Sequence, residues 1–299
     1  MLLDKGISVA YIFNKIKYDL VYILLVGLIT NLLATYARQY FPEMPLTIPV
    51  FLGTAISILL SFKMNQSYDR WWEARKVWGA IVNDSRSFVL QLQSFLDPNE
   101  ATANCIQKLA YRQIAWCYCL GQSLRGLNPL EGIEDLLMEA DRAKLLQHTN
   151  KPLALLQQHT VDIQELRLTN KMDVFRHVQL DNTLVRLCDS MGKAERINST
   201  VFPSTYRHFL HFIIYLFVVT LSIALNNVEI IFELPLLLLI SAAFLLIEKS
   251  AYHLQDPFRN RPSDVSVTAI ARTIDINIRQ LLGESDVPLP VKPNDYYLL

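Results

Sequence analysis

Residues 46–62 constrain this chain most, because they form a run of seventeen residues without a charged side chain. The run leads directly into a polar, aromatic block that begins at Lys63 and contains the adjacent pair Trp71 and Trp72. A helix of that length can cross the hydrocarbon core of a bilayer, and tryptophans with basic residues beside it are typical of the membrane interface. The junction predicts a membrane-spanning helix and a membrane protein.

Three further apolar segments, residues 20–37, 208–228 and 229–247, predict additional spanning helices. The last has an uncharged core that is too short for a bilayer of about 30 Å at roughly 1.5 Å per residue. Either Glu233 enters the membrane field, with Glu229 before it, or the helix is tilted, capped by protein or re-entrant. Because Glu233 lies near a helix end, we expect its carboxylate to be solvated or to snorkel to the interface.

The distribution of basic residues predicts the orientation of these spans. Lys5, Lys15 and Lys17 precede the first span, whereas Arg38 is the only basic residue in the loop that follows it. Positive residues accumulate on the cytoplasmic side, so the N-terminus is expected there, and four crossings return the C-terminus to the same side. The long stretches 63–206 and 248–299 are therefore expected to be cytoplasmic.

Composition excludes several classes of function. The chain has 28 basic and 28 acidic residues, so no overall field would attract a nucleic acid. The sequence has no glycine-rich phosphate loop, no nucleophile elbow and no metal triad. We therefore expect no enzyme activity, no cofactor and no metal. His208 and His211 lack a third ligand nearby, and we expect water or backbone to satisfy them.

The cytoplasmic part is predicted to be helical. Leu180, Leu184, Leu187 and Met191 recur at helical spacing and give an apolar stripe. The four cysteines lack metal-binding spacing and are expected to be free, buried thiols; they are Cys105, Cys117, Cys119 and Cys188. The predicted fold is all-α: a polytopic membrane protein with four transmembrane helices continuous with a cytoplasmic helical bundle, residues 1–299 forming one domain.

Several strings resemble the bestrophin family of ion channels, and the resemblance covers most of the chain. The strings are the Arg-Trp-Trp block at 68–79, the segment 192–197 before the third span, and the Asp-Pro-Phe turn after the fourth. The signature residues are Arg70, Trp71, Trp72, Glu73, Glu195, Arg196, Pro203, Asp256, Pro257 and Phe258.

This resemblance implies a homopentamer around one axial pore in the inner membrane of a bacterium, with the second span lining a narrow neck. Carried over from Arg70, the neck positions are Thr54, Ile58 and Phe62, which are spaced four apart and share a helix face. Rings of Ile and Phe would gate by dewetting. Thr54 replaces an apolar residue, so the outermost ring is expected to be wetter. The alternative is that Ile58 and Phe62 face lipid or the core.

The resemblance also places a cytoplasmic aperture at Phe175, or at Val174 if the alignment shifts by one residue; the alternative for Phe175 is a packed aromatic side chain. Animal relatives bind Ca²⁺ through an acidic run after the corresponding turn, but here Arg259 and Arg261 replace carboxylates. We therefore expect no calcium gating. The implied function is the passage of small monovalent ions, with chloride and other anions as the expected ones. Two alternatives stay open: a cation-permeable channel of the same fold, and a non-conducting membrane scaffold or sensor.

Overall fold

The computed structural model describes residues 9–36, 44–200, 203–226, 228–294 and 296–299. Over these residues the regular structure is helical, apart from an isolated antiparallel bridge between Asn294 and Tyr297. The elements are α1 (Val9–Tyr36), α2 (Thr47–Phe95), α3 (Glu100–Leu124), η2 (Glu134–Leu136), α4 (Glu139–Leu146), α5 (Lys151–Leu168), α6 (Val174–Ser199), α7 (Ser204–Ala224), α8 (Ile230–Gln255) and α9 (Val267–Leu281). The predicted all-α class is confirmed.

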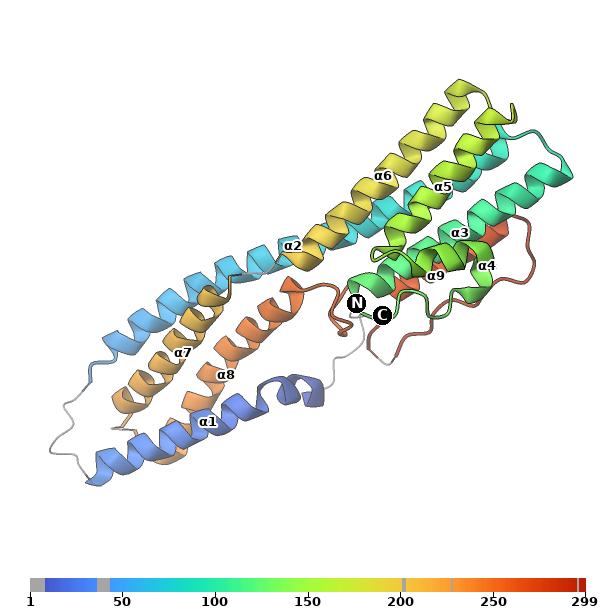
Figure 1. Ribbon diagram of the computed structural model, residues 1–299. Helices are drawn as coiled ribbons and strands as arrows, with labels where there is room; N and C mark the ends of the chain where they lie inside the picture. The colour runs from blue at the N-terminus through green and yellow to red at the C-terminus, as the bar shows by residue number, and fades with distance from the viewer. Residues whose placement is uncertain (1–8, 37–43, 201–202, 227, 295) are drawn as a thin grey trace. The chain divides into compact units, whose positions relative to one another are not determined.

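The chain divides into two compact units, and the 49-residue helix α2 contributes to both. The unit that we call the transmembrane unit comprises residues 4–70 and 201–255. The unit that we call the helical unit contains 71–200 and 256–299. Each unit is described separately below (Figure 1).

The transmembrane unit contains the four predicted membrane-crossing segments. Among the described residues, four helices are long and apolar enough to span a bilayer, and they include Phe13–Leu33, Thr205–Ala224 and Ile230–Gln255 beside the long helix α2. The helices differ from the predicted spans at their ends. α1 begins before residue 20, and α7 ends at Ala224, so the turn between the third and fourth spans precedes the predicted boundary. Residues 37 and 227 lie outside the described residues.

These four helices pack through small residues and a buried apolar core. Gly27 on α1 lies so close to α8 that a Cβ atom there would be 2.7 Å from a methyl carbon of Leu234. Gly53 on α2 similarly faces Phe217 on α7, with 3.3 Å to its ring. Close approach through small residues is common where helices pack in membranes, since apolar burial gives little driving force there. The core residues include Ile23, Ile56, Leu60, Leu210, Ile214, Val218, Leu237 and Leu245.

The helical unit has its own apolar core, with the indoles of Trp78 and Trp116 and the ring of Phe88 among its largest fully buried side chains. The predicted stripe on α6 is confirmed, since Leu180, Leu184, Leu187 and Met191 are all buried. The expectation for the thiols is confirmed in part. All four cysteines are free, and Cys117 and Cys119 are buried, but Cys188 is exposed.

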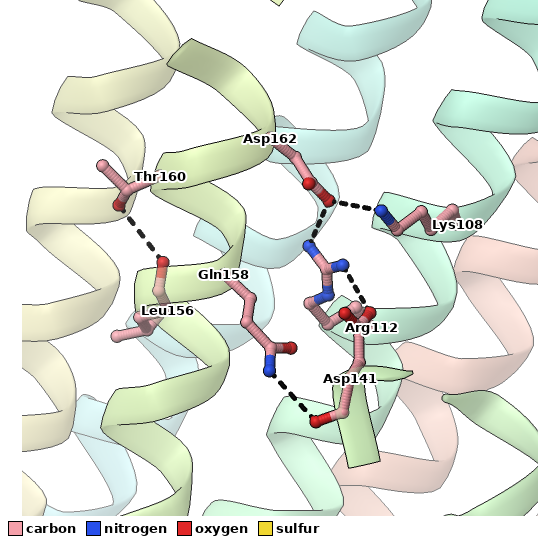
Figure 2. A network of polar contacts seen from close by, with 7 residues as sticks. All are labelled: Lys108, Arg112, Asp141, Leu156, Gln158, Thr160 and Asp162. Carbon is pink, nitrogen blue, oxygen red and sulfur yellow. Dashed lines mark hydrogen bonds and ion pairs between the residues drawn. The ribbon is translucent and has the colours of Figure 1, made fainter. Parts of the chain in front are cut away.

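A buried ionic network fixes α3 against α4 and α5 (Figure 2). The Arg112 guanidinium, only 1% exposed, donates to Asp141 at 2.5 Å and to Asp162 at 2.7 Å. Lys108 lies 2.9 Å from the same Asp162 oxygen, and Gln158 donates to the backbone carbonyl of Asp141 at 3.1 Å. Burial alone would raise the pKa of Asp162, but the bonds and charges of Lys108 and Arg112 outweigh it, so the pKa is lowered. The charges of two cations and two carboxylates thus cancel inside the helical unit.

His159 on α5 lies in the same interior. It is fully buried, and its ring packs edge-on against Phe88 at a centroid distance of 4.9 Å. Neither ring nitrogen has a hydrogen-bond partner in the part of the chain that the structure describes. Burial lowers the pKa of His159 well below its usual value, and the positive charges of Arg112 and Lys108 act in the same direction. The imidazole is therefore neutral in the folded chain at neutral pH.

Candidate functional site

The membrane-crossing part of α2 has two distinct faces. Ile56, Leu60 and Lys63 are buried, and they recur at spacings of four and three. Thr54, Ile58 and Phe62 occupy another face and are exposed, with Ile58 54% and Phe62 62% accessible. The alternative that Ile58 and Phe62 belong to the core of the chain is therefore wrong. Their exposed face is free to meet lipid, water or another copy of the chain, and the neck stays a prediction.

Phe62 lines a hollow within the transmembrane unit. The cavity has a volume of about 690 Å³ and is lined mainly by apolar side chains from α2 and α7. At its edge the Tyr206 hydroxyl donates to the backbone carbonyl of Leu59 at 2.9 Å, which ties the start of α7 to α2. The signature residue Pro203 lines the same hollow.

The buried face of α2 carries an ionic cluster that the sequence did not predict. Lys63 Nζ lies 2.7 Å from Glu248 Oε1 on α8, and both side chains are almost fully buried. The other oxygen, Glu248 Oε2, lies 3.2 Å from His211 Nε2 on α7. His211 is therefore not a boundary histidine satisfied by water or backbone, as we expected, whereas His208 one turn earlier is exposed. We call Lys63, His211 and Glu248 the Lys63 cluster.

A second ion pair adjoins this cluster and brings in α1. Lys249 of α8 pairs with Asp19 and also donates to the backbone carbonyl of Lys15 at 2.7 Å. The Tyr215 hydroxyl donates to Asp19 at 3.3 Å, and its ring lies 6.2 Å from that of His211. Charged and polar groups from all four helices therefore meet inside the transmembrane unit. Charges buried between the helices of a membrane protein are costly unless paired, and they commonly have functional roles.

Glu233 forms a separate polar centre within the same unit. Its carboxylate is fully buried and accepts hydrogen bonds from Asn31 Nδ2 at 3.0 Å and from Ser222 Oγ at 3.2 Å. Thr30 is hydrogen-bonded to Ser222 in turn. Our expectation that Glu233 is solvated or snorkels was wrong, because polar side chains of α1 and α7 enclose it. Glu229, by contrast, is exposed.

The Arg-Trp-Trp block joins α2 to the end of α8 and to the loop that follows it. Within the transmembrane unit, Arg70 Nε donates to the carbonyl of Gln255, the last residue of α8, at 2.9 Å. Within the helical unit, Trp71 Nε1 donates to the carbonyl of Ser263 at 3.0 Å. Trp72 is exposed and stacks on Trp71, and Glu73 forms an exposed ion pair with Lys76. The block therefore has clear structural contacts.

The other signature residues also have structural contacts. Glu195 on α6 accepts a hydrogen bond at 2.9 Å from the side chain of Asn150, the residue that caps the N-terminus of α5. Arg196 is exposed, and its backbone carbonyl accepts from Thr200. Phe258 is buried in the core of the helical unit. These contacts account for the residues without assigning them a role in ion passage.

In the loop after Asp256 and Pro257, the acidic side chain of Asp264 forms a hydrogen bond within the loop itself. Asp264 is almost fully buried, and its Oδ2 accepts from the backbone N–H of Arg261 at 3.0 Å. Burial raises the pKa of Asp264, although hydrogen bonds from the backbone of Arg261 and Arg259 act against it. Val265 N–H donates to the Pro257 carbonyl at 3.1 Å and closes the turn. Among the described residues, no group of three His, Cys, Asp or Glu could hold a metal.

The predicted aperture residues lie in the first turn of α6. Asp173 caps this helix and accepts from the backbone N–H of Phe175 at 2.8 Å and of Arg176 at 3.0 Å. Val174 is 58% exposed and Phe175 is 86% exposed. Phe175 is therefore not packed inside the bundle of its own chain, which was the alternative. Its assignment to an aperture stays a prediction.

Comparison with known proteins agrees with the resemblance seen in the sequence. The family described as "Bacterial/Fungal Bestrophin protein" matches residues 7–280. The "Voltage-dependent anion channel-forming protein YneE" of Escherichia coli K12 is 31% identical over 252 residues, covering 83% of this chain and 80% of that protein. The similarly named protein RSc3414 of Ralstonia nicotianae is 27% identical over 233 residues, or 78% of this chain and 76% of its own length.

A solved structure resembles the whole fold. The crystal structure of a bacterial bestrophin homologue from Klebsiella pneumoniae superposes with a TM-score of 0.84 at 27% identity. The match covers 91% of this chain and 100% of that one. The arrangement of helices is therefore shared along nearly the full length of both chains.

Proposed function

The chain belongs to the bacterial and fungal bestrophin family, and from this premise we propose that it is an anion channel whose neck is lined by Thr54, Ile58 and Phe62. The observation that carries the proposal is the division of α2 into two faces. One face is buried and carries the paired Lys63, whereas the predicted neck residues are exposed at helical spacing. A pore-lining face must be free of contacts within its own subunit.

We propose that five copies enclose the pore, with the α2 helices around the axis. Closed cyclic symmetry is the usual arrangement of such assemblies, and an exposed helix face needs several copies to surround an aqueous path. Light scattering in mild detergents should give the mass of a pentamer. A monomer or dimer mass across several detergents would refute the proposal of a pore on the axis of a pentamer.

Apolar rings at Ile58 and Phe62 would form the gate. A narrow apolar constriction expels water and so resists the passage of hydrated ions. The Thr54 hydroxyl donates to the Val50 carbonyl of its own helix at 2.9 Å, so its proton is not available to the pore. The lone pairs of the Thr54 oxygen and its methyl group remain available to the lumen of the proposed pore. The outer ring would then be wetter than the rings of Ile58 and Phe62 without closing the neck.

We propose that the ion carried is chloride or another small anion, because the two relatives are named voltage-dependent anion channel-forming proteins. Uncharged rings can reject ions for their hydration cost, but they do not select the sign of the charge. Selection must therefore come from groups outside the neck. A reversal potential under a KCl gradient decides the sign, and movement toward the K⁺ equilibrium value would favour the cation-permeable alternative.

We place the protein in the inner membrane of a bacterium, with both termini in the cytoplasm and the helical unit on that side. The four apolar helices and the basic residues before the first span support this placement. The role is transport rather than catalysis, in keeping with the channel-forming relatives. Protease protection in inverted membrane vesicles would report which side holds the helical unit.

Ion flux into proteoliposomes tests the neck. Phe62→Ala and Ile58→Ala should raise flux, because smaller rings lower the dewetting barrier. Phe212→Ala is a matched control: Phe212 lies on α7 of the same unit and is 65% exposed, close to the 62% of Phe62. If all three variants assemble normally and their flux equals that of the wild type, the α2 face does not form the gate.

A further inference from the structure

Lys63 follows Phe62 directly along α2, so the Lys63 cluster is attached to the helix at the proposed gate. Successive residues of an α-helix are about 100° apart around its axis. Holding the Lys63 ammonium against Glu248 on α8 therefore fixes the rotation of α2 and the direction of the Phe62 side chain. The contact is short, at 2.7 Å, and Lys63 is only 1% exposed, so little water is present to replace a lost partner.

His211 is the histidine of this environment, and it lies among groups of both charges. His211 contacts Glu248 on α8 and the ring of Tyr215 on its own helix. The ionisable groups linked to these two are Lys63 on α2, which pairs with Glu248, and Asp19 on α1, which accepts from Tyr215 and pairs with Lys249 on α8. The two lysines and two carboxylates form two ion pairs and sum to zero charge. Imidazole is the side chain that commonly gains a proton between pH 5 and 8, whereas lysine, tyrosine and paired carboxylates titrate outside that range.

The geometry gives protonation of His211 a definite consequence. Glu248 presents one oxygen to each neighbour: Oε1 lies 2.7 Å from Lys63, and Oε2 lies 3.2 Å from His211 Nε2. The His211 side chain is 27% exposed, whereas its Nε2 atom is buried. An imidazolium would place a second positive charge on the same carboxylate, and repulsion between two cations is strong where little water screens it.

We propose that the Lys63 cluster is a proton-sensitive support of the neck, in which protonated His211 competes with Lys63 for Glu248, loosens α2 at Phe62 and raises ion flux. Neutral His211 leaves the carboxylate to Lys63 and holds the gate in its narrow state. The inference rests on the proposed neck. Lys63 and Glu248 act as positioning residues, and the ligand of the site is a proton.

The test compares flux at pH 7.5 and pH 5.5, a range that spans ordinary histidine titration. Proteoliposomes would carry the wild type, His211→Gln or His208→Gln. Wild-type flux should rise several-fold on acidification, and His211→Gln should abolish most of that rise. His208→Gln is the matched control because His208 is exposed one turn away on α7, and it should respond as the wild type does.

The outcomes separate the two claims. If acid raises flux equally in His211→Gln and the wild type, or if acid lowers wild-type flux, the inference fails. Phe62→Ala is measured beside them: a raised flux in this variant keeps the neck standing when the inference fails, and an unchanged flux removes the neck itself. Should His211→Gln not assemble by light scattering, His211→Asn serves as the second neutral variant under the same criteria.

Discussion

Replacing Glu248 by Gln should destabilise the protein strongly, because it leaves the Lys63 ammonium buried without a counter-charge. The two groups are 2.7 Å apart, with side chains 0% and 2% exposed. Removing one partner of a buried ion pair costs about 3–5 kcal/mol, most of it from the uncompensated charge that remains. His211, whose Nε2 lies 3.2 Å from the other Glu248 oxygen, provides no relief because an imidazole carries no negative charge at any pH considered.

The double variant Lys63→Met/Glu248→Leu should recover most of that loss. Replacing both charges by apolar groups of similar volume is often neutral or even stabilising, since the desolvation cost of both ions disappears. The comparison therefore separates the cost of an orphaned charge from the contribution of the pair. A charge cluster kept for function rather than stability gives this pattern.

Thermal unfolding in detergent, followed by tryptophan fluorescence, measures both variants. At roughly 2–4 °C per kcal/mol for chains of about 150–250 residues, Glu248→Gln should lower Tm by on the order of 10 °C. Lys76→Met is the surface control, since its pair with Glu73 is 57% and 40% exposed, and such pairs contribute about 0–1 kcal/mol. Equal losses in the single and double variants, or a loss no larger than that of Lys76→Met, would refute the reasoning.

Three further predictions concern the helical unit and its loop. Arg112→Met should lower stability by about 3–5 kcal/mol because Asp141 loses its buried cation, whereas Arg112→Met/Asp141→Leu should recover part of this in denaturant unfolding; no recovery would argue against an orphaned charge. Neutral buried His159 should make the fold acid-sensitive: the unfolded chain gains a proton below about pH 6.5 and the folded chain does not, so stability present above that pH falls by up to about 2 kcal/mol at pH 5. His159→Leu should reduce that fall, and an unchanged pH profile would contradict the assignment. Chelation of Ca²⁺ should leave currents intact, since Arg259 and Arg261 stand where ligands would be needed; a current lost on chelation and restored by Ca²⁺ would reveal an unidentified site.

Much of the fold could be predicted because it follows from local patterns. Uncharged runs of membrane length gave the four spanning helices, and the 4-3-4 spacing of Leu180, Leu184, Leu187 and Met191 gave the buried face of α6. The resemblance, carried over from Arg70, proposed Thr54, Ile58 and Phe62 as neck positions, and their spacing by four placed them on one face of α2; spacing alone did not predict that this face is exposed. Helix ends were less accurate, since composition changes gradually where α1 and α7 meet the interface.

The contacts that define the site could not be read from local patterns. Lys63 and Glu248 are 185 positions apart, and each looks like an ordinary interfacial charge beside an apolar run. Glu233 likewise depends on Asn31 and Ser222 from two other helices for its hydrogen bonds. The sequence contained only a weak indication, because a charged side chain that directly follows a span can turn toward the protein interior as readily as toward solvent. The packing of the helices decides between these two directions.

Modification of a cysteine placed at Phe62 tests the central claim most directly. In Phe62→Cys channels, a charged, membrane-impermeant methanethiosulfonate reagent should change the current irreversibly, because the modified side chain would project into the water-filled neck. Phe212→Cys should behave as the wild type, whose native cysteines report any background, including the exposed Cys188. If modification of a folded, conducting Phe62→Cys channel is verified by mass and the current does not change, α2 does not line the pore.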